Sequence, residues 1–250
     1  QATTNEWISK KEAEFLLNTE SRVPYFYTLP KIHKNILPPP GRPIVSGINS
    51  LLEPLSQYVD FFLQPLIPKM QSYIKDTKHL LTKLDSIAFN VNDNILIGLD
   101  VVALYTNIPQ QETLRVVEEI LRSMTWTFSA PVDFIITLAE LALTRNFFQY
   151  KDTYYLQQHG TSMGSTFAPS LACLYVDWFE RQYIWTQNNF SDNILHWYRY
   201  IDDILIIWKG GENEITPFVT WLNSLNQFLS FTVSFSRTSL PFLDVCICTS

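Results

Sequence analysis

The stretch Tyr198–Trp208, "YRYIDDILIIW", places two adjacent aspartates between two runs of Ile, Leu, Tyr and Trp. We interpret the runs as two strands joined at Asp202 and Asp203, because β-branched and aromatic residues favour strands and Asp tolerates turns. Two carboxylates about 4 Å apart, however, repel each other by roughly 1 kcal/mol in water. Gly or Asn closes such a turn without this repulsion. The stretch therefore indicates either an ordinary surface turn or a site that binds a cation.

A third carboxylate, Asp100, interrupts another apolar run, Ile95–Tyr105, which we expect to be a strand. A charge embedded in such a strand needs a partner. A divalent cation shared by Asp100, Asp202 and Asp203 meets this need, and hard oxygen ligands select Mg²⁺ or Mn²⁺. Two strands that bring carboxylates to one edge of a sheet have the geometry of two-metal phosphoryl transfer.

Composition limits the other classes of function. The chain has 250 residues, of which 46% are hydrophobic, so it can bury a core as one large domain or two interleaved ones. Its longest apolar runs, such as "ILIIW", are far shorter than the roughly 18 residues that cross a bilayer, so we expect no membrane span. The three cysteines form no paired pattern, which argues against a disulfide scaffold or a zinc site and favours a reducing compartment.

Charge is unevenly distributed. The net charge of −6 argues mildly against a partner bound all over the surface through its phosphates. Residues 21–50 nevertheless contain no Asp or Glu and carry Arg22, Lys31, Lys34 and Arg42. The prolines of this segment exclude a helix and predict extended arms around a turn.

The pattern of elements predicts an α+β fold rather than an alternating parallel one. Helical spacing predicts a helix after a Ser50 cap, and further helices at 77–84, after Pro109, at 131–145 and at 166–184. We expect strands at 95–105, 153–158, on both sides of the paired aspartates, at 231–235 and within 240–248.

Six motifs follow one another in order along the chain: "PKIHK" (30–34), "GRPIVSG" (41–47), "LDVVALYTNIP" (99–109), "GTSMGSTFAP" (160–169), "YIDD" (200–203) and "FLDV" (242–245). A lone pair of aspartates is a weak signal, but this ordered series is specific and covers nearly the whole chain. The series resembles the reverse transcriptase family, and specifically its Penelope-like retroelement branch.

This resemblance implies a right-hand polymerase fold with an antiparallel palm sheet backed by helices. Its fingers are expected at 1–95 and 110–156 and its palm at 96–109 and 157–250, with the thumb absent or truncated. The implied function is RNA-directed DNA polymerisation, in which the enzyme extends a DNA primer 3′-OH on an RNA template with deoxynucleotides. The implied cofactor is a pair of Mg²⁺ ions, with Mn²⁺ as the substitute. The implied location is inside the cell, in the nucleus.

The resemblance also implies site residues. Asp100 and Asp202 are expected to coordinate the metals, with Asp203 as a weaker ligand and the carbonyl of Val101 completing one site. Lys31 and Arg42 are expected to grip the triphosphate, Tyr105 to exclude a 2′-OH, and Met163 and Gly164 to approach the nascent base pair; Lys34 is a third candidate for the triphosphate. Each has a simpler interpretation: a solvated basic loop for the cations, a core aromatic for Tyr105 and a turn for Gly164.

Two rival functions remain. "GTSMG" (160–164) also fits the G-x-S-x-G nucleophile elbow of serine hydrolases, with Ser162 as nucleophile. His196 is the only later histidine, just 34 residues on, and no HGGG-type oxyanion segment is present. The other rival is a catalytically silent nucleic-acid-binding remnant of a retroelement.

Overall fold

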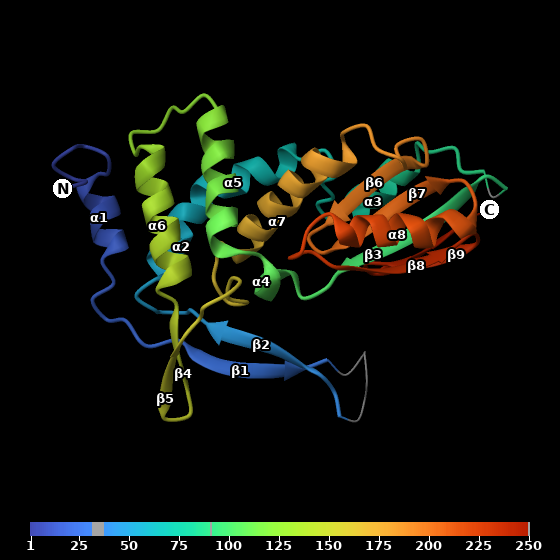
Figure 1. Cartoon of the computed structure of the whole chain (residues 1–250). Coiled ribbons are helices and arrows are strands. Elements are labelled where there is room, and N and C mark those ends of the chain that lie inside the picture. The colour runs from blue at the N-terminus through green and yellow to red at the C-terminus, as the bar shows by residue number, and fades with distance from the viewer. Residues whose placement is uncertain (32–37, 91, 250) are drawn as a thin grey trace. The chain divides into compact units, whose positions relative to one another are not determined.

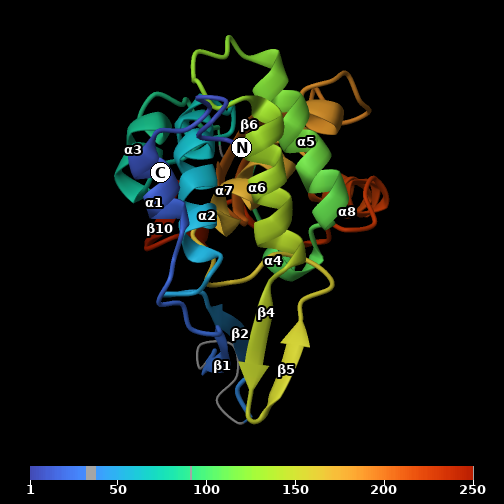
Figure 2. The same cartoon turned by 90° about the vertical axis from the view of Figure 1, so that its left-hand side faces the viewer.

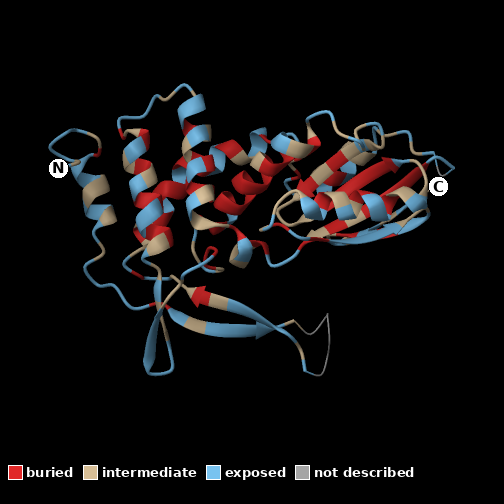
Figure 3. Cartoon of the chain, viewed as in Figure 1, coloured by how far each residue is buried: buried red, intermediate tan, exposed pale blue. Residues whose placement is uncertain are grey.

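The most deeply buried strands form an antiparallel sheet with the order β6-β7-β3-β8. The computed structural model describes all residues except 32–37, 91 and 250. The strands of the sheet are β3 (Asn94–Val101), β6 (Ile194–Tyr200), β7 (Asp203–Lys209) and β8 (Phe231–Ser236) (Figure 1). Figure 3 shows β3 and β7 as mostly buried, as their near-continuous apolar sequences require.

Both faces of this sheet are covered. On one face, α8 (Ile215–Ser224) packs Phe218 against Trp208 of β7, with ring centroids 4.8 Å apart. On the other face, Leu96, Leu205 and Ile207 form a buried cluster with residues of α3 (Thr77–Leu84) and of the hairpin β9 (Ser239–Phe242) and β10 (Val245–Cys248). The cluster accounts for the apolar residues on this face that precede Asp100 in β3 and follow Asp203 in β7.

Three hairpins share one unusual turn. The two-residue loops Lys151–Asp152, Ile201–Asp202 and Leu243–Asp244 connect β4 to β5, β6 to β7 and β9 to β10. In each loop the first residue has a positive φ, 54°, 55° and 51°, whereas the aspartate does not. This is the pattern of a type II′ turn, whose first position prefers Gly. Ile201 is β-branched, so its conformation stores strain of about 1–3 kcal/mol.

The chain forms two compact units, residues 1–64 with 105–175 and residues 65–104 with 176–250. The second unit contains the β6-β7-β3-β8 sheet. Residues 65–95, which we expected in the fingers, belong to it because their backbone joins β6: Ile74 N–H donates to the Arg199 carbonyl at 2.9 Å. The bounds of these units differ from the expected bounds of fingers and palm, which stay a prediction.

The first unit combines helices with a second, more exposed sheet. Its helices α1 (Lys10–Leu16), α2 (Glu53–Leu63), α5 (Gln110–Ser123) and α6 (Val132–Thr144) pack in series, with α2 touching α1 and α6, and α6 touching α5 (Figure 2). Its sheet has the order β2-β1-β4-β5, made of β1 (Tyr25–Pro30), β2 (Gly41–Ser46), β4 (Phe147–Tyr150) and β5 (Thr153–Leu156). Most residues of β1, β4 and β5 are exposed or half-buried (Figure 3).

Most expected elements are present, with some corrections. The helix expected from 166 to 184 is α7 (Ala168–Phe179), which continues as a π-helical turn, η2 (Glu180–Ile184). Ser50 does not cap α2, whose N-cap is Leu52 without a side-chain hydrogen bond. The sequence patterns did not reveal α1, α8 or β4. None of the described helices has both the length and the apolar character needed to cross a membrane.

A carboxyl group is buried in the first unit. Asp60 on α2 is 3% exposed and accepts hydrogen bonds from Ser170 Oγ at 2.5 Å and Gln64 Nε2 at 2.7 Å. Burial raises the pKa of Asp60 above its usual value, and the two hydrogen bonds only partly oppose this effect. The folded protein therefore favours the protonated carboxyl, so Asp60 lowers stability as pH rises from about 4 through its raised pKa.

We expect Asp60→Asn to increase the free energy of unfolding at pH 7–8, because the amide keeps a hydrogen-bonding group without a buried charge. The difference from the unaltered protein should shrink as pH falls and should be smallest well below about pH 4, where Asp60 is protonated in both the folded and the unfolded state. Urea unfolding at a series of pH values measures this. If the gain in unfolding free energy caused by Asp60→Asn is smaller at pH 8 than at pH 4, the assignment is contradicted.

Candidate active site

The sheet brings two of the candidate carboxylates face to face. Asp100, the next-to-last residue of β3, is paired with Asp203 of β7 on one side and Thr232 of β8 on the other. Directly opposite residues of an antiparallel pair project to the same face, with Cβ atoms about 4.5–5.5 Å apart. Like charges in this arrangement are destabilising, so Asp100 and Asp203 need a compensating charge.

Asp202 reaches the same edge through its backbone. It is the second residue of the β6–β7 loop, and its carbonyl accepts a hydrogen bond from Val101 N–H at 3.0 Å. Asp100, Asp202 and Asp203 are all partly exposed, whereas Val101 is buried. The prediction that the strand bearing Asp100 lies beside the hairpin bearing the two other aspartates is therefore confirmed; the roles of the four residues stay predictions.

The donor set fits a hard divalent cation in its chemistry. Three carboxylates and a nearby backbone carbonyl are oxygen ligands of the kind that Mg²⁺ and Mn²⁺ prefer. Within the described parts of the chain, however, no three His, Cys, Asp or Glu side chains gather closely enough to hold a metal ion. Mg²⁺ is commonly held by one or two carboxylates together with substrate phosphates rather than by a cage of protein ligands. Metal binding here is thus expected to depend on the substrate.

The predicted triphosphate residues lie together in the first unit. Lys31 directly follows β1, and its N–H donates to the Pro40 carbonyl at 2.8 Å. Arg42, the second residue of β2, is paired with Leu29 of β1. Both cations therefore lie at the same end of one hairpin. Lys34 falls outside the described residues.

The loop Gly160–Gly164 links the remaining candidates of this unit. Thr161 N–H donates to the carbonyl of Tyr105, in the short helix α4 (Leu104–Asn107), at 2.6 Å. Gly164 has φ +155°, and a Cβ at this position would lie 2.1 Å from the carbonyl oxygen of Val45 in β2. The close approach to β2 is by itself a reason for glycine, so a contact of Gly164 and Met163 with a base pair stays a prediction.

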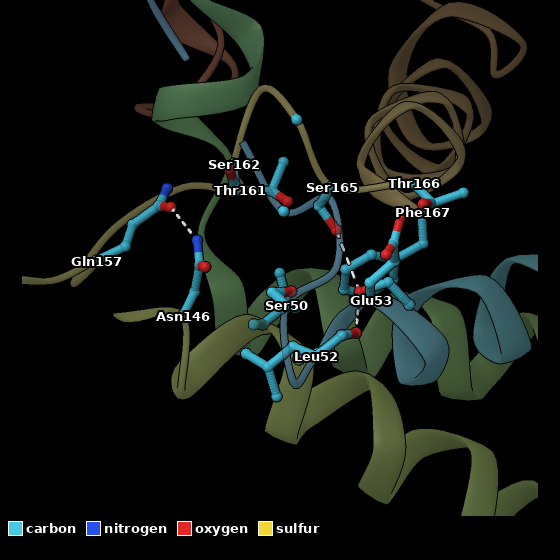
Figure 4. A pocket seen from close by; sticks show the side chains of 15 residues that line it. Ser50, Leu52, Glu53, Asn146, Gln157, Thr161, Ser162, Ser165, Thr166 and Phe167 are labelled. Atoms are coloured by element: carbon cyan, nitrogen blue, oxygen red, sulfur yellow. Dashed lines mark hydrogen bonds between the residues drawn. The ribbon is translucent and has the colours of Figure 1, made fainter. Parts of the chain in front are cut away.

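A small polar pocket adjoins this loop (Figure 4). Hydrogen bonds across it join Asn146 to Gln157 at 2.8 Å and Ser165 to Ser56 at 3.3 Å. Its free volume of about 20 Å³ holds about one water molecule and no organic substrate. Ser162 is 7% exposed and donates its hydroxyl to the Val45 carbonyl at 3.2 Å, not to a catalytic base. These observations argue against Ser162 as the nucleophile of a hydrolase.

Comparison with protein families gives the family of the chain. The family described as reverse transcriptase (RNA-dependent DNA polymerase) matches residues 35–237. The chain belongs to the reverse transcriptase family. No curated protein matches its sequence significantly. Membership of this family indicates a nucleotidyltransferase of the nucleic-acid polymerase class. The family match does not distinguish branches, so the Penelope-like branch stays a prediction.

Several solved polymerase structures have the same fold as this reverse transcriptase chain. Telomerase from Candida albicans in complex with a TWJ fragment of telomeric RNA has a TM-score of 0.63 at 13% identity, over 93% of this chain and 46% of that one. Apo telomerase from Candida tropicalis has a TM-score of 0.65 at 11% identity, over 92% and 48%. The BmCPV RNA-dependent RNA polymerase at its elongation state has 0.64 at 12%, over 99% and 23%.

The reverse transcriptase chain thus spans about half of the telomerases or less, and under a quarter of the viral polymerase. The likeness confirms the expected α+β polymerase fold, with an antiparallel sheet and covering helices. We call the β6–β7 loop, Ile201–Asp202, the aspartate turn. Sequence reasoning missed two buried groups behind this turn, Glu180 and Ser72. A glutamate within the apolar helical run "YVDWFERQYI" (175–184) was the signal available for one of them.

We expect Gly164→Ala to lower the free energy of unfolding by about 2–4 kcal/mol, because the methyl group meets the Val45 backbone and φ is unfavourable. Gly41→Ala is the matched control: its Cβ meets only the side chain of Thr28, at 3.3 Å, and it should cost under about 1 kcal/mol. Chemical denaturation compares the two. Equal losses contradict the proposed packing of the loop on β2.

Proposed function

We propose that this chain is the catalytic core of an RNA-directed DNA polymerase that extends a DNA primer 3′-OH with deoxynucleotides on an RNA template. One observation carries the proposal: Asp100 lies opposite Asp203, beside the loop that holds Asp202, in a chain of the reverse transcriptase family. Metal-dependent phosphoryl transfer gives a reason for two carboxylates that face each other on adjacent strands, and an ordinary surface turn does not.

The acidic residues have distinct proposed roles. Asp100 and Asp202 are the principal ligands of two divalent cations, with Asp203 and the carbonyl of Val101 as further ligands. Bound Mg²⁺, or Mn²⁺ in its place, stabilises the negative charge that develops on the attacking and leaving oxygens. The cations also relieve the repulsion between Asp100 and Asp203 that the sheet imposes.

The nucleotide contacts are proposed for the first unit. A triphosphate carries about four negative charges, so the adjacent cations Lys31 and Arg42 suit it, one as a point charge and the other as a bidentate fork. Tyr105 is proposed to contact the sugar, and Met163 and Gly164 the base pair. Support comes from the Gly160–Gly164 loop, which donates a hydrogen bond to the Tyr105 carbonyl and packs Gly164 against Val45 of β2, the strand that carries Arg42.

The finer assignments follow from the motifs. We place the chain in the Penelope-like branch on the ordered series from "PKIHK" to "FLDV". RNA as template and the nucleus as site of action rest on that placement, together with the description of the family as RNA-dependent. The second candidate function is that of an inactive nucleic-acid-binding remnant. Such a remnant has the same fold, so only a measurement of activity distinguishes it from an active polymerase.

Primer extension tests the proposal directly. The chain is given one DNA primer annealed to RNA and DNA templates of the same sequence, with deoxynucleotides and Mg²⁺. We expect extension on RNA that EDTA abolishes and that added Mg²⁺ or Mn²⁺ restores. Binding of the annealed RNA without any extension favours the inactive remnant, and extension on DNA alone refutes RNA direction.

We expect Asp202→Asn to keep the fold and to slow extension about a thousandfold, equivalent to about 4 kcal/mol in the transition state, because it removes a metal-binding charge. Asp152→Asn is the matched control, since Asp152 occupies the same position of a turn with the same φ pattern. It should leave extension unchanged. Near-normal extension by the Asp202 variant removes the metal assignment.

We expect Tyr105→Ala to admit ribonucleotides, because the ring no longer blocks the space of a 2′-OH. The ratio of kcat/KM for dNTP over rNTP should fall at least tenfold, a change of about 1.4 kcal/mol or more. Tyr154→Ala, at an exposed tyrosine of β5, is the control and should not change the ratio. If the Tyr105 variant discriminates between the two sugars as the unaltered chain does, the proposed sugar contact is wrong and the Tyr105 ring has a packing role only.

A further inference from the structure

A buried ion pair lies behind the aspartate turn. The side chains of Arg199 and Glu180 are 2% and 0% exposed. Glu180 Oε1 accepts from Arg199 Nε and Trp197 Nε1, both at 2.8 Å, and its Oε2 accepts from Ser72 Oγ at 2.6 Å and Arg199 Nη2 at 3.3 Å. The carboxylate is therefore fully engaged, and Arg199 holds it at two points.

Stability alone is a weak reason for this pair. The desolvation of two buried charges can exceed their attraction, and apolar replacements of such pairs are often as stable. The pair does, however, contact the turn. Arg199 Nη1 donates to the carbonyl of Ile201 at 3.3 Å, and Ile201 is the strained residue with φ +55° directly before Asp202.

Arg199 is itself fixed at its backbone. Its N–H donates to the Ser72 carbonyl at 2.7 Å, and its carbonyl accepts from Ile74 N–H at 2.9 Å. These bonds join the outer edge of β6 to the segment 72–74. With Glu180 holding the guanidinium, both ends of the arginine are restrained, so it can act as a rigid donor.

Each of the two peptide groups around Asp202 has a carbonyl that accepts a hydrogen bond from outside the turn. The Ile201 carbonyl belongs to the planar peptide before Asp202, and Arg199 binds it. The Asp202 carbonyl belongs to the peptide after it, and Val101 N–H binds it. Together the two bonds fix the backbone on both sides of Asp202 and thereby the direction of its side chain.

We propose that Arg199, held by Glu180, is a positioning residue that keeps the strained Ile201 turn in the conformation in which Asp202 binds metal. The inference rests on the proposed function for its catalytic consequence, but its structural part does not. Without the Arg199 donor, the peptide between Ile201 and Asp202 loses the bond that opposes its rotation towards an unstrained turn, and such a rotation redirects the Asp202 carboxylate.

Two variants test this without leaving a lone buried charge. Arg199→Lys keeps a cation for Glu180 but has no planar fork to reach Ile201 as well. The double variant Glu180→Gln with Arg199→Met removes both charges and removes the donor to Ile201. The Gln oxygen can still accept from Trp197, and its amide N–H can donate to the Ser72 hydroxyl. Arg237→Lys is the control, because the partly exposed Arg237 pairs with the exposed Glu212 at 3.0 Å in the same unit.

Amide hydrogen exchange measures the turn without metal. Val101 N–H bonds to the Asp202 carbonyl, whereas its neighbour Val102 N–H bonds to the Ser230 carbonyl at 2.8 Å. We expect exchange at Val101 to quicken at least tenfold in both test variants, with exchange at Val102 unchanged and the Arg237 variant like the unaltered chain. A change at both amides alike indicates general loosening and overturns the proposal.

Metal binding and extension give the second readout. With a dNTP and an annealed primer that lacks a 3′-OH present, Mn²⁺ titration followed by electron paramagnetic resonance should show affinity reduced about tenfold in the test variants. Extension should need about tenfold more Mg²⁺, with a smaller change in kcat at saturation. Normal exchange at Val101 with normal Mn²⁺ affinity overturns the proposal. Unfolding of both test variants also overturns it, because the pair then maintains the whole fold rather than the turn.

The proposed function can fail separately. If the unaltered chain extends no primer, the polymerase assignment fails, while the Val101 exchange and the Mn²⁺ titration still decide whether Arg199 positions Asp202. If the unaltered chain extends primers and the variants match it in exchange, metal affinity and extension, the positioning role alone is refuted.

Discussion

The repulsion between the carboxylates of Asp100 and Asp203 is the constraint around which the rest of the second unit is arranged. Their strands pair in a register that leaves the two charges opposite each other, at an edge of the sheet where water and ligands have access. The buried apolar residues that follow fix this register, because a slip by one residue turns every side chain to the wrong face. Hydrophobic packing thus maintains an unfavourable electrostatic contact that a cation can relieve.

The turn between β6 and β7 stores a second unfavourable contribution. Ile201 adopts a conformation that suits glycine, and the buried Arg199–Glu180 pair is placed to hold it there. Strain of this kind is found at sites where the surroundings determine the geometry more strongly than local preference does. The residue after the loop is Asp203 in the β6–β7 hairpin, where it faces Asp100, but Thr153 or Val245 in the other two hairpins. The facing carboxylates, and not the turn itself, therefore distinguish the candidate site.

The sequence predicted the part of the fold that has strong local signals. The apolar runs around Asp202 and Asp203, the prolines before α5 and α6 and the helical spacing at 77–84 all correspond to observed elements. The convergence of Asp100 with the hairpin was predictable because a buried strand charge needs a partner. The Glu180–Arg199–Ser72 network was not, since it joins residues more than a hundred positions apart without a repeating pattern. The positive φ of Ile201 was also hidden, because β-branched residues rarely adopt it.

The two-residue length of the loop Ile201–Asp202 has a genetic consequence. Substitutions there alter single groups, and their effects are graded. An inserted or deleted codon instead changes the loop length that sets the register of β6 on β7, which moves Asp202 away from the edge of the sheet where Asp100 and Asp203 lie. Among diverging copies of such a gene, length changes at this turn should therefore be far scarcer than in the exposed β4–β5 loop, even where point changes accumulate equally.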